Sequence, residues 1–148
     1  NLRIRIYGKG DRNWKQLERW SDKYPNANID NCENTLEKEA LNSRIIITTY
    51  NATAFLEPLA ANIPTIIFWD NENYSYPKNA EYDFKQLEKA GIFYKSPYDA
   101  AKFLNYIWDD IEEWWSGSSL QKVRKEFCLK YANFDDKIVY RISNVLKE

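Results

Sequence analysis

Hydrophobic and polar residues alternate along positions 2–7, which predicts a β-strand with one covered face. A polar, glycine-flanked loop follows at 8–13, and the apolar spacing over 14–21 then predicts a short helix that Pro25 ends. Residues 29–31 have the composition of a minimal strand. The pattern therefore predicts that the chain begins with a strand, a helix and a second strand.

The next segments are more apolar and are typical of a parallel sheet. Asn34 followed by Glu37 fits a capping box, which predicts a helix through about residue 41. Residues 44–50 and 63–69 are almost continuously apolar and β-branched, as expected for parallel strands that are covered on both faces. The helical stretch 54–61 between them completes a β–α–β unit.

Helical spacing dominates from residue 80 onward. One helix is expected over 80–91, and residues 92–94 indicate a short strand. Ser96 and Pro97 are strong start signals for a helix whose apolar period continues for about five turns, to Trp115. Two further helices are expected, one that Ser118 caps together with Gln121 and one that begins at about residue 136.

The alternation of strands and helices predicts an α/β protein. We expect a Rossmann-like, three-layer αβα domain with a mostly parallel sheet and extra C-terminal helices. The 148 residues contain no internal repeat and no linker long enough to divide them, so a single domain over 1–148 is expected. In such a sheet, ligands bind beyond the carboxyl ends of the strands.

Composition narrows the classes of function. Lys and Arg (21) nearly balance Asp and Glu (22), so the net charge does not favour nucleic acid or anionic lipid as a partner. No apolar run in the sequence is long enough to cross a bilayer. The sequence has no histidine, which excludes Ser-His-Asp triads, Cys-His pairs and nearly all zinc hydrolase designs. Cys32 and Cys128 have no metal-ligand spacing; we expect buried, inert thiols, no metal and a reducing, cytoplasmic compartment.

The segment 48–58 carries the most informative candidate chemistry, because a buried strand passes through small polar residues directly into a helix. Main-chain N–H groups and the helix dipole at such a point favour a phosphate. Tyr50, Asn51 and Thr53 could add contacts to it, and Glu57 could accept hydrogen bonds from a ribose diol. The alternative is that Thr53 only caps the helix and Glu57 only complements its dipole.

Basic residues surround the first loop, which would meet this segment at the same edge of the sheet. Arg5, Lys9 and Arg12 could neutralise a diphosphate or a leaving nucleotide, with Arg acting as a bidentate fork. The alternative is a solvated basic turn. The glycines of this loop form neither a GxGxxG nor a Walker pattern, so a dinucleotide or P-loop fingerprint is absent from the sequence.

The loop 69–76 is rich in aromatic and hydrogen-bonding side chains, in a chain of which aromatics make up 16%. Trp69, Asn73 and Tyr74 could contact a sugar, whereas a mobile surface loop and ordinary core filling are the alternatives. Asp70 and Glu72 alone are weak evidence for Mg²⁺.

A run of tryptophans lies in the helical part of the sequence. Trp108, Ile111 and Trp115 share a helical face and are expected in the core. Trp114 is expected to be exposed or in contact with another domain.

Residues 49–60 (TYNATAFLEPLA), followed by 62–66 (NIPTI), resemble the nucleotide-binding, C-terminal half of GT-B glycosyltransferases. In that half, a strand–loop–helix segment ends in a Glu, and a small-x-Pro strand follows. The match looks closest to transferases of bacterial surface-polysaccharide clusters, whose helical tails carry a run like Ile107–Trp115. The loop-to-Pro stretch is also similar to Kdo transferases and, more distantly, to polyglycerolphosphate transferases. This sequence differs in having no His in the loop and no Gly-Gly before the helix.

The resemblance implies a nucleotide sugar as donor substrate, with no cofactor and no metal. Asn51 and Thr53 would hold the donor phosphate, Glu57 would bind the ribose, and the basic residues around the first loop would balance leaving-group charge. The acceptor site and the catalytic base would lie in an N-terminal domain outside this sequence. We expect this chain alone to bind a nucleotide weakly and to turn nothing over. We expect no nucleic-acid partner, and peripheral inner-membrane association is one option for the full-length protein.

A non-catalytic α/β module that binds glycan or protein is the competing class. It predicts sugar binding that does not depend on a nucleotide. A flavodoxin-like regulatory domain fits less well, because Asp11 is the only acid in the first loop of the sequence. The donor, the acceptor and the stereochemical outcome stay open.

Overall fold

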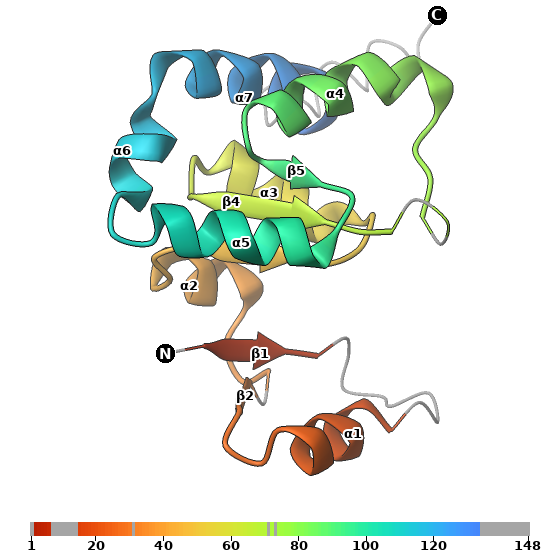
Figure 1. Cartoon of the computed structure of the whole chain (residues 1–148), viewed down its shortest axis with the longest axis vertical. Coiled ribbons are helices and arrows are strands. Elements are labelled where there is room, and N and C mark those ends of the chain that lie inside the picture. Colours follow the sequence, from red (N-terminus) through yellow and green to blue (C-terminus); the bar gives the residue numbers. More distant parts are fainter. Residues whose placement is uncertain (1, 7–14, 31, 71, 73, 134–148) are drawn as a thin grey trace, which may run out of the picture. The chain divides into compact units, whose positions relative to one another are not determined.

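The computed structural model describes residues 2–6, 15–30, 32–70, 72 and 74–133 of the chain (Figure 1). The chain divides into two compact units, Asn1–Glu39 and Ala40–Glu148. Every strand pairing among the described residues is parallel. The predicted α/β class is therefore confirmed, with the strands in two small sheets, and the single domain over 1–148 stays a prediction.

The first unit holds a two-stranded parallel sheet. β1 (Arg3–Arg5) pairs with β2 (Asn28–Asp30) in a register that places Arg5 beside Asp30. α1 (Gln16–Lys23) connects the two strands, as the apolar spacing predicts. Both side chains therefore stand at the carboxyl end of this sheet.

The helix α2 spans Leu36–Leu41, whereas a cap at Asn34 would start the helix at residue 35. Thr35 Oγ1 accepts a hydrogen bond from the main-chain N–H of Lys38 at 3.3 Å, so Thr35 takes the capping position. The predicted capping box at Asn34 is wrong. The amide of Asn34 instead donates to the carboxylate of Glu39.

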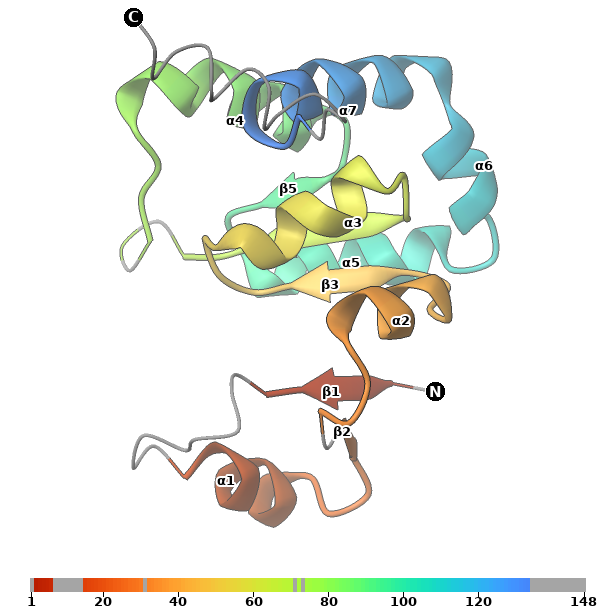
Figure 2. The same cartoon turned by 180° about the vertical axis from the view of Figure 1, so that it is seen from behind.

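The second unit holds a three-stranded parallel sheet in the order β3–β4–β5, of which Figure 1 labels β4 and β5 and Figure 2 labels β3 and β5. Its strands are β3 (Ile46–Thr48), β4 (Thr65–Phe68) and β5 (Phe93–Tyr94). The first three residues of β4 are buried, as expected for a central strand. β3 lies at the edge of this sheet, and Ile47 is 37% exposed. The prediction of two covered faces is right for β4 and wrong for β3.

Helical segments follow each strand of this sheet. η1 (Thr53–Phe55) and α3 (Leu56–Ala60) join β3 to β4, and η2 (Lys78–Ala80) with α4 (Glu81–Lys89) joins β4 to β5. α7 (Ser118–Tyr131) packs against both α3 and α4. Gly117 holds the N-cap position and Ser118 is already the first residue of the helix, so the predicted cap of Ser118 with Gln121 is wrong.

The long helix predicted from Pro97 to Trp115 is divided into two. α5 (Pro97–Ile107) starts as expected, with Ser96 Oγ accepting a hydrogen bond from Asp99 N at 3.3 Å. The main-chain N–H of Asp110 then bonds to the carbonyl of Ile107, which closes a turn before α6 (Ile111–Ser116). The helix expected from residue 136 lies outside the described residues.

Alternate side chains of the central strand enter two hydrophobic clusters. Ile67 and the adjoining Trp69 pack with residues of α3, α4 and α7, whereas Ile66 and Phe68 pack with residues of α5 and α6. This division follows from the period of two along a strand. The second unit therefore has helices on both faces of its parallel sheet, as Figures 1 and 2 show from opposite sides.

Candidate functional site

The loops at the carboxyl edge of the second sheet are joined by a side-chain hydrogen bond. β3 ends at Thr48 and β4 ends at Phe68, and parallel strands place these ends at the same edge. Beyond them, Asn51 Nδ2 donates to the main-chain oxygen of Ser75 at 2.9 Å. The structure thus brings together two of the segments that the sequence singles out, 48–58 and 69–76. We name the described residues of these two segments the carboxyl-edge site.

The helix after β3 starts differently from the prediction. Ala52 is extended, and Thr53 is the exposed first residue of the 3₁₀ turn η1, where no side chain caps the turn. The alternative that Thr53 is only an N-cap is therefore wrong. The turn leads into α3, which places Pro58 in the first turn of that helix, where a missing N–H group costs little. This irregular start agrees with the early position of the proline.

Three more predicted site residues, besides Thr53, lie in or next to this irregular start. Tyr50 and Asn51 are half-buried, and the main-chain oxygen of Tyr50 accepts a hydrogen bond from Ala52 N at 3.1 Å. Glu57 is exposed in the first turn of α3, and no described residue bonds its carboxylate. Its oxygen atoms can therefore accept hydrogen bonds from a ligand hydroxyl.

Trp69 is a core residue, and the prediction that it contacts a sugar is wrong. Its side chain is 1% exposed, and its ring centroid lies 4.7 Å from that of Phe93, 5.4 Å from Phe84 and 5.7 Å from Phe55. The three rings meet the indole at tilted or edge-on angles, which are favourable packing geometries for aromatic pairs. The ring therefore stabilises the sheet from inside and is not available for stacking.

Tyr74 lies on the surface, and its contact with a sugar stays a prediction. It is 43% exposed, and its main-chain N–H bonds to the carbonyl of Asp70 at 2.9 Å. The carboxylate of Asp70 also accepts the N–H of Glu72 at 2.9 Å, a side-chain-stabilised turn typical of aspartate. Asn73 lies outside the described residues.

Two buried polar atoms lie at this edge without a partner among the described residues, Thr48 Oγ1 and Trp69 Nε1. The register of β3 and β4 sets Thr48 beside Ile67. Trp69 follows Ile67 by two residues, just after the end of β4, so Thr48 and Trp69 lie on the same face of the sheet. Buried polar groups in folded proteins are nearly always bonded. Thr48 is the first residue of the segment 48–58 but is not among the residues predicted to contact a ligand.

In the first unit, Arg5 belongs to an ion-pair cluster. Arg5 Nε lies 3.3 Å from Asp30 Oδ2, and Arg3 Nη2 lies 3.2 Å from Asp30 Oδ1. Asp30 is 3% exposed and also accepts the N–H of Cys32 at 3.1 Å. Asp30 therefore balances much of the charge of Arg5, which was predicted to meet a phosphate. The Nη1 atom of Arg5 has no partner among the described residues. Lys9 and Arg12 lie outside the described residues.

The two thiols differ in burial. Cys128 is buried, as expected, whereas Cys32 is half-buried, with its sulfur atom 3.9 Å from the carbonyl of Ile6. Burial raises the pKa of the Cys128 thiol, and this effect outweighs the nearby Arg124 guanidinium, which lowers it. The expectation of burial is thus right for Cys128 and wrong for Cys32.

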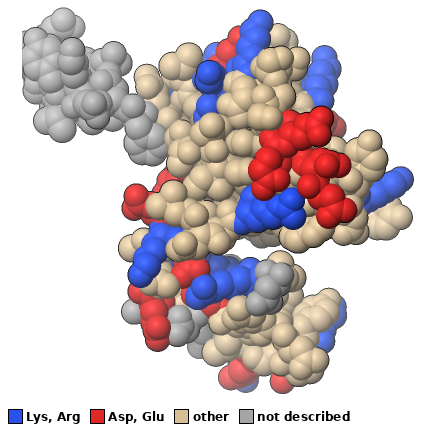
Figure 3. Space-filling view, turned by 90° about the vertical axis from the view of Figure 1, so that its left-hand side faces the viewer, with Lys and Arg blue, Asp and Glu red and all other residues tan. Residues whose placement is uncertain are grey.

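The tryptophan run divides between core and surface. Ile111 and Trp115 are buried, and Trp114 is half-buried. Trp108 is 44% exposed, so its predicted place in the core is wrong, and the guanidinium carbon of Arg44 lies 5.3 Å from its ring centroid. Figure 3 shows acidic side chains gathered beside a basic one on this face. The exposed acids of this segment are Asp109, Asp110, Glu112 and Glu113, of which Glu112 pairs with Arg44 at 3.4 Å.

The fold and the carboxyl-edge site place the chain among the α/β proteins that present loops at the carboxyl ends of parallel strands. The chain belongs to the LIC12162 transferase family, whose model, described as LIC12162 family transferase, matches residues 1–145. Comparisons with curated proteins and with solved structures gave no match. Among the described residues, no helix combines the length and the apolar character that a membrane span requires.

Proposed function

We propose that this chain is the nucleotide-sugar donor-binding domain of a GT-B-type glycosyltransferase that acts in bacterial surface-polysaccharide biosynthesis. The hydrogen bond from Asn51 to Ser75 carries the proposal, because it joins the two loops at the edge where parallel sheets bind ligands. Membership of a transferase family and an α/β arrangement with parallel sheets, which is compatible with a Rossmann-like fold, support it. The resemblance of residues 49–66 to GT-B enzymes supplies the donor class.

The residues of the carboxyl-edge site then have distinct roles. The exposed hydroxyl of Thr53 and the main-chain N–H groups of η1 would bind the donor phosphate. The exposed carboxylate of Glu57 would accept hydrogen bonds from the ribose. Tyr74 would contact the sugar from the neighbouring loop, with Asn51 holding that loop in place and Tyr50 flanking it.

Negative charge develops on the leaving nucleotide as the bond between its phosphate oxygen and the sugar breaks. Lys9 and Arg12 are the cations that we propose for this charge. Arg5 would contribute less, because Asp30 already balances it. An N-terminal domain of a longer, cytoplasmic protein with peripheral membrane association would supply the acceptor site and the base. No cofactor and no metal enter this proposal.

Titration of the chain with CMP, CDP, UDP and GDP, followed by NMR or calorimetry with and without Mg²⁺, tests the proposal. We expect saturable binding of one nucleotide that Glu57→Ala removes. Glu113→Ala is the matched control, since Glu113 is an exposed acid in the first turn of another short helix, and it should leave the affinity unchanged. Equal binding by Glu57→Ala, or no binding of any nucleotide up to about 1 mM, would contradict the proposed site.

The same titration separates the competing class. A non-catalytic glycan-binding module would bind an oligosaccharide without nucleotide and would keep that binding in Glu57→Ala. Tyr74→Ala would then reduce glycan binding, because Tyr74 is the exposed aromatic residue of the loop.

A further inference from the structure

Arg124 on α7 is a buried cation whose recorded partners are neutral. It is 7% exposed, its Nη1 atom donates to the carbonyl of Leu59 at 2.7 Å, and its Nε atom donates to Gln121 Oε1 at 3.0 Å. The main-chain oxygen of Leu59 and the amide oxygen of Gln121 are both uncharged acceptors. Buried charges in proteins are normally paired with a charge of opposite sign. Among the described residues, Arg124 is therefore a buried cation without a counter-ion.

The neighbouring thiol does not supply the missing charge. Cys128 lies one helical turn after Arg124. Burial raises the pKa of the Cys128 thiol more strongly than Arg124 lowers it, so the thiol stays protonated near neutral pH. The charge of Arg124 is therefore not balanced by a thiolate.

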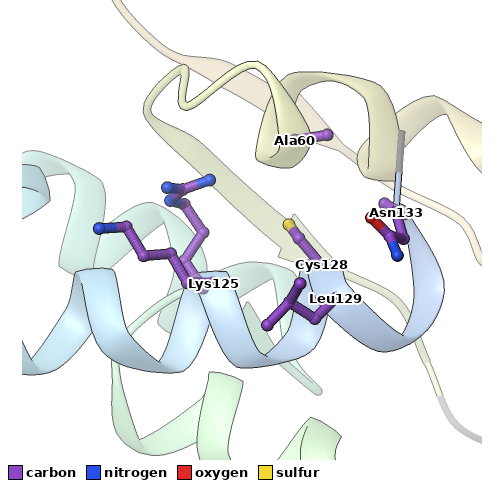
Figure 4. Close-up of a pocket in the computed structure, with 7 residues that line it drawn as sticks. Ala60, Lys125, Cys128, Leu129 and Asn133 are labelled. Atoms are coloured by element: carbon purple, nitrogen blue, oxygen red, sulfur yellow. The ribbon is translucent and has the colours of Figure 1, made fainter. Parts of the chain in front are cut away.

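A cavity of about 310 Å³ adjoins Arg124, a volume at the lower end of the range for small-molecule sites. Its apolar wall consists of Ala60, Leu129 and Ala132, with the thiol of Cys128 between α7 and α3 (Figure 4). Lys125 and Asn133 line it as well. The described lining thus contains two cations and no carboxylate.

We infer that this cavity binds a small organic acid, with its carboxylate against Arg124 and Lys125 and its apolar body on Ala60, Leu129 and Ala132. Arg124 Nε and Nη1 each already donate one hydrogen bond within the chain, so the carboxylate would accept charge-assisted hydrogen bonds from the remaining N–H groups of the guanidinium. The apolar wall gains nothing from a bare inorganic anion, whereas it is covered by the hydrocarbon part of an organic acid. Leu129, which is 67% exposed, would be the side chain that such a ligand shields most.

This cavity is separate from the carboxyl-edge site. α3 leads from the carboxyl end of β3 to the amino end of β4, and Ala60 is its last residue. The cavity therefore adjoins the end of α3 that is remote from Thr53 and the proposed donor phosphate. Failure of nucleotide binding and failure of organic-acid binding are independent results.

An NMR titration of the whole chain with benzoate tests the inference, with benzamide as an uncharged molecule of nearly the same shape. We expect saturable shifts of the amide signals of residues 124–133 and of Ala60 with benzoate, at a Kd of about 1 mM or below. Benzamide at the same concentrations should leave these signals unchanged. Equal shifts with both compounds, or no localised shifts with benzoate, would overturn the inference.

Variants on the exposed rim separate binding from folding. Lys125→Gln should weaken benzoate binding about two- to fivefold, and Asn133→Asp should weaken it further by adding a negative charge. Lys122→Gln is the matched control, because Lys122 is exposed on the same helix but does not line the cavity. Arg124→Gln should abolish binding, and its circular dichroism reports whether loss of the bond to Leu59 has unfolded the chain. Unchanged affinity in both Lys125→Gln and Asn133→Asp would overturn the assignment.

Discussion

The Nδ2 atom of Asn51 lies 2.9 Å from the main-chain oxygen of Ser75 and joins the loops that follow two neighbouring parallel strands. Asn51→Asp removes this bond, because a carboxylate has no N–H group to donate to a carbonyl. We expect the free energy of unfolding to fall by about 0.5–1.5 kcal/mol and hydrogen exchange in the loop after β4 to become faster. Hydrogen-exchange mass spectrometry measures this effect directly.

Asn105→Asp is the control for this variant, since Asn105 is an exposed residue of α5 outside the carboxyl-edge site. In this control, hydrogen exchange in the loop after β4 should be as fast as in the unmodified chain. If Asn51→Asp also left this exchange rate unchanged, the bond would not restrain the loop. Loss of nucleotide binding in Asn51→Asp, but not in Asn105→Asp, is the further result that the proposed function requires.

Trp69 and Tyr74 are close in sequence, but Trp69 is buried and Tyr74 is exposed. Their alanine variants should therefore differ in the free energy of unfolding. Trp69→Ala leaves a large cavity among Phe55, Phe84 and Phe93, and we expect a loss of about 3–5 kcal/mol in the free energy of unfolding. Tyr74→Ala should change it by no more than about 0.5 kcal/mol, because its side chain is on the surface. Urea denaturation compares the two, and similar losses in both variants would contradict the core position of Trp69.

The order of the elements is predictable because it depends on local signals. The apolar, β-branched runs at 44–50 and 63–69 contain β3 and β4, and Ser96 with Pro97 marks the start of α5. Each of these signals lies inside one element or at its end, so the neighbouring residues are sufficient to produce it.

The side chains of the site depend on contacts that the local pattern does not contain. Trp69 follows β4 directly, and only the packing of Phe55 and Phe93 from other segments places its ring in the core. The pairing of Arg5 with Asp30 likewise arises when two separate strands come into register. Such long-range partners determine which candidate residues still face a ligand.

The division between α5 and α6 shows a limit of the apolar period. The period continues through Ile107 and Ile111, so it predicts one helix across the turn. The signal that could have revealed the turn is Asp110, which stands at the N-cap position of α6, although its side chain makes no capping hydrogen bond there. Aspartate is favoured there and is less favourable inside a helix. The turn also moves Trp108 from the predicted core face to the surface.

The two thiols should differ in their rate of alkylation. The thiolate is the reactive form, and burial both raises the pKa of Cys128 and restricts access to it. We expect iodoacetamide to modify half-buried Cys32 at least about tenfold faster than Cys128 in the folded chain. Mass spectrometry of Cys32→Ser isolates the slow site, and a denaturant should make the rates similar. Equal rates without denaturant would contradict the burial of Cys128.

Asp83 on α4 is held by two residues of α7, and this contact should make stability depend on pH. Asp83 accepts hydrogen bonds from Lys130 Nζ at 2.8 and 3.0 Å and from the Tyr131 hydroxyl at 2.8 Å. Burial raises the pKa of this carboxyl, but the bonds from Lys130 and Tyr131 outweigh burial and bring the pKa below its ordinary value of 3.8. The folded state therefore binds a proton at Asp83 less readily than the unfolded state does.

A group whose pKa is lower in the folded state stabilises the fold above its ordinary pKa, and this contribution is lost as the pH falls through the folded value. Asp83→Asn removes the charge, and we expect it to cost about 1–3 kcal/mol near neutral pH. Below pH 3.8 the difference between the two chains should shrink toward a small, constant value. Urea denaturation across this range measures it, with exposed Asp109→Asn as the control. A difference that does not vary with pH would mean that the charge on Asp83 does not contribute to the contact between α4 and α7.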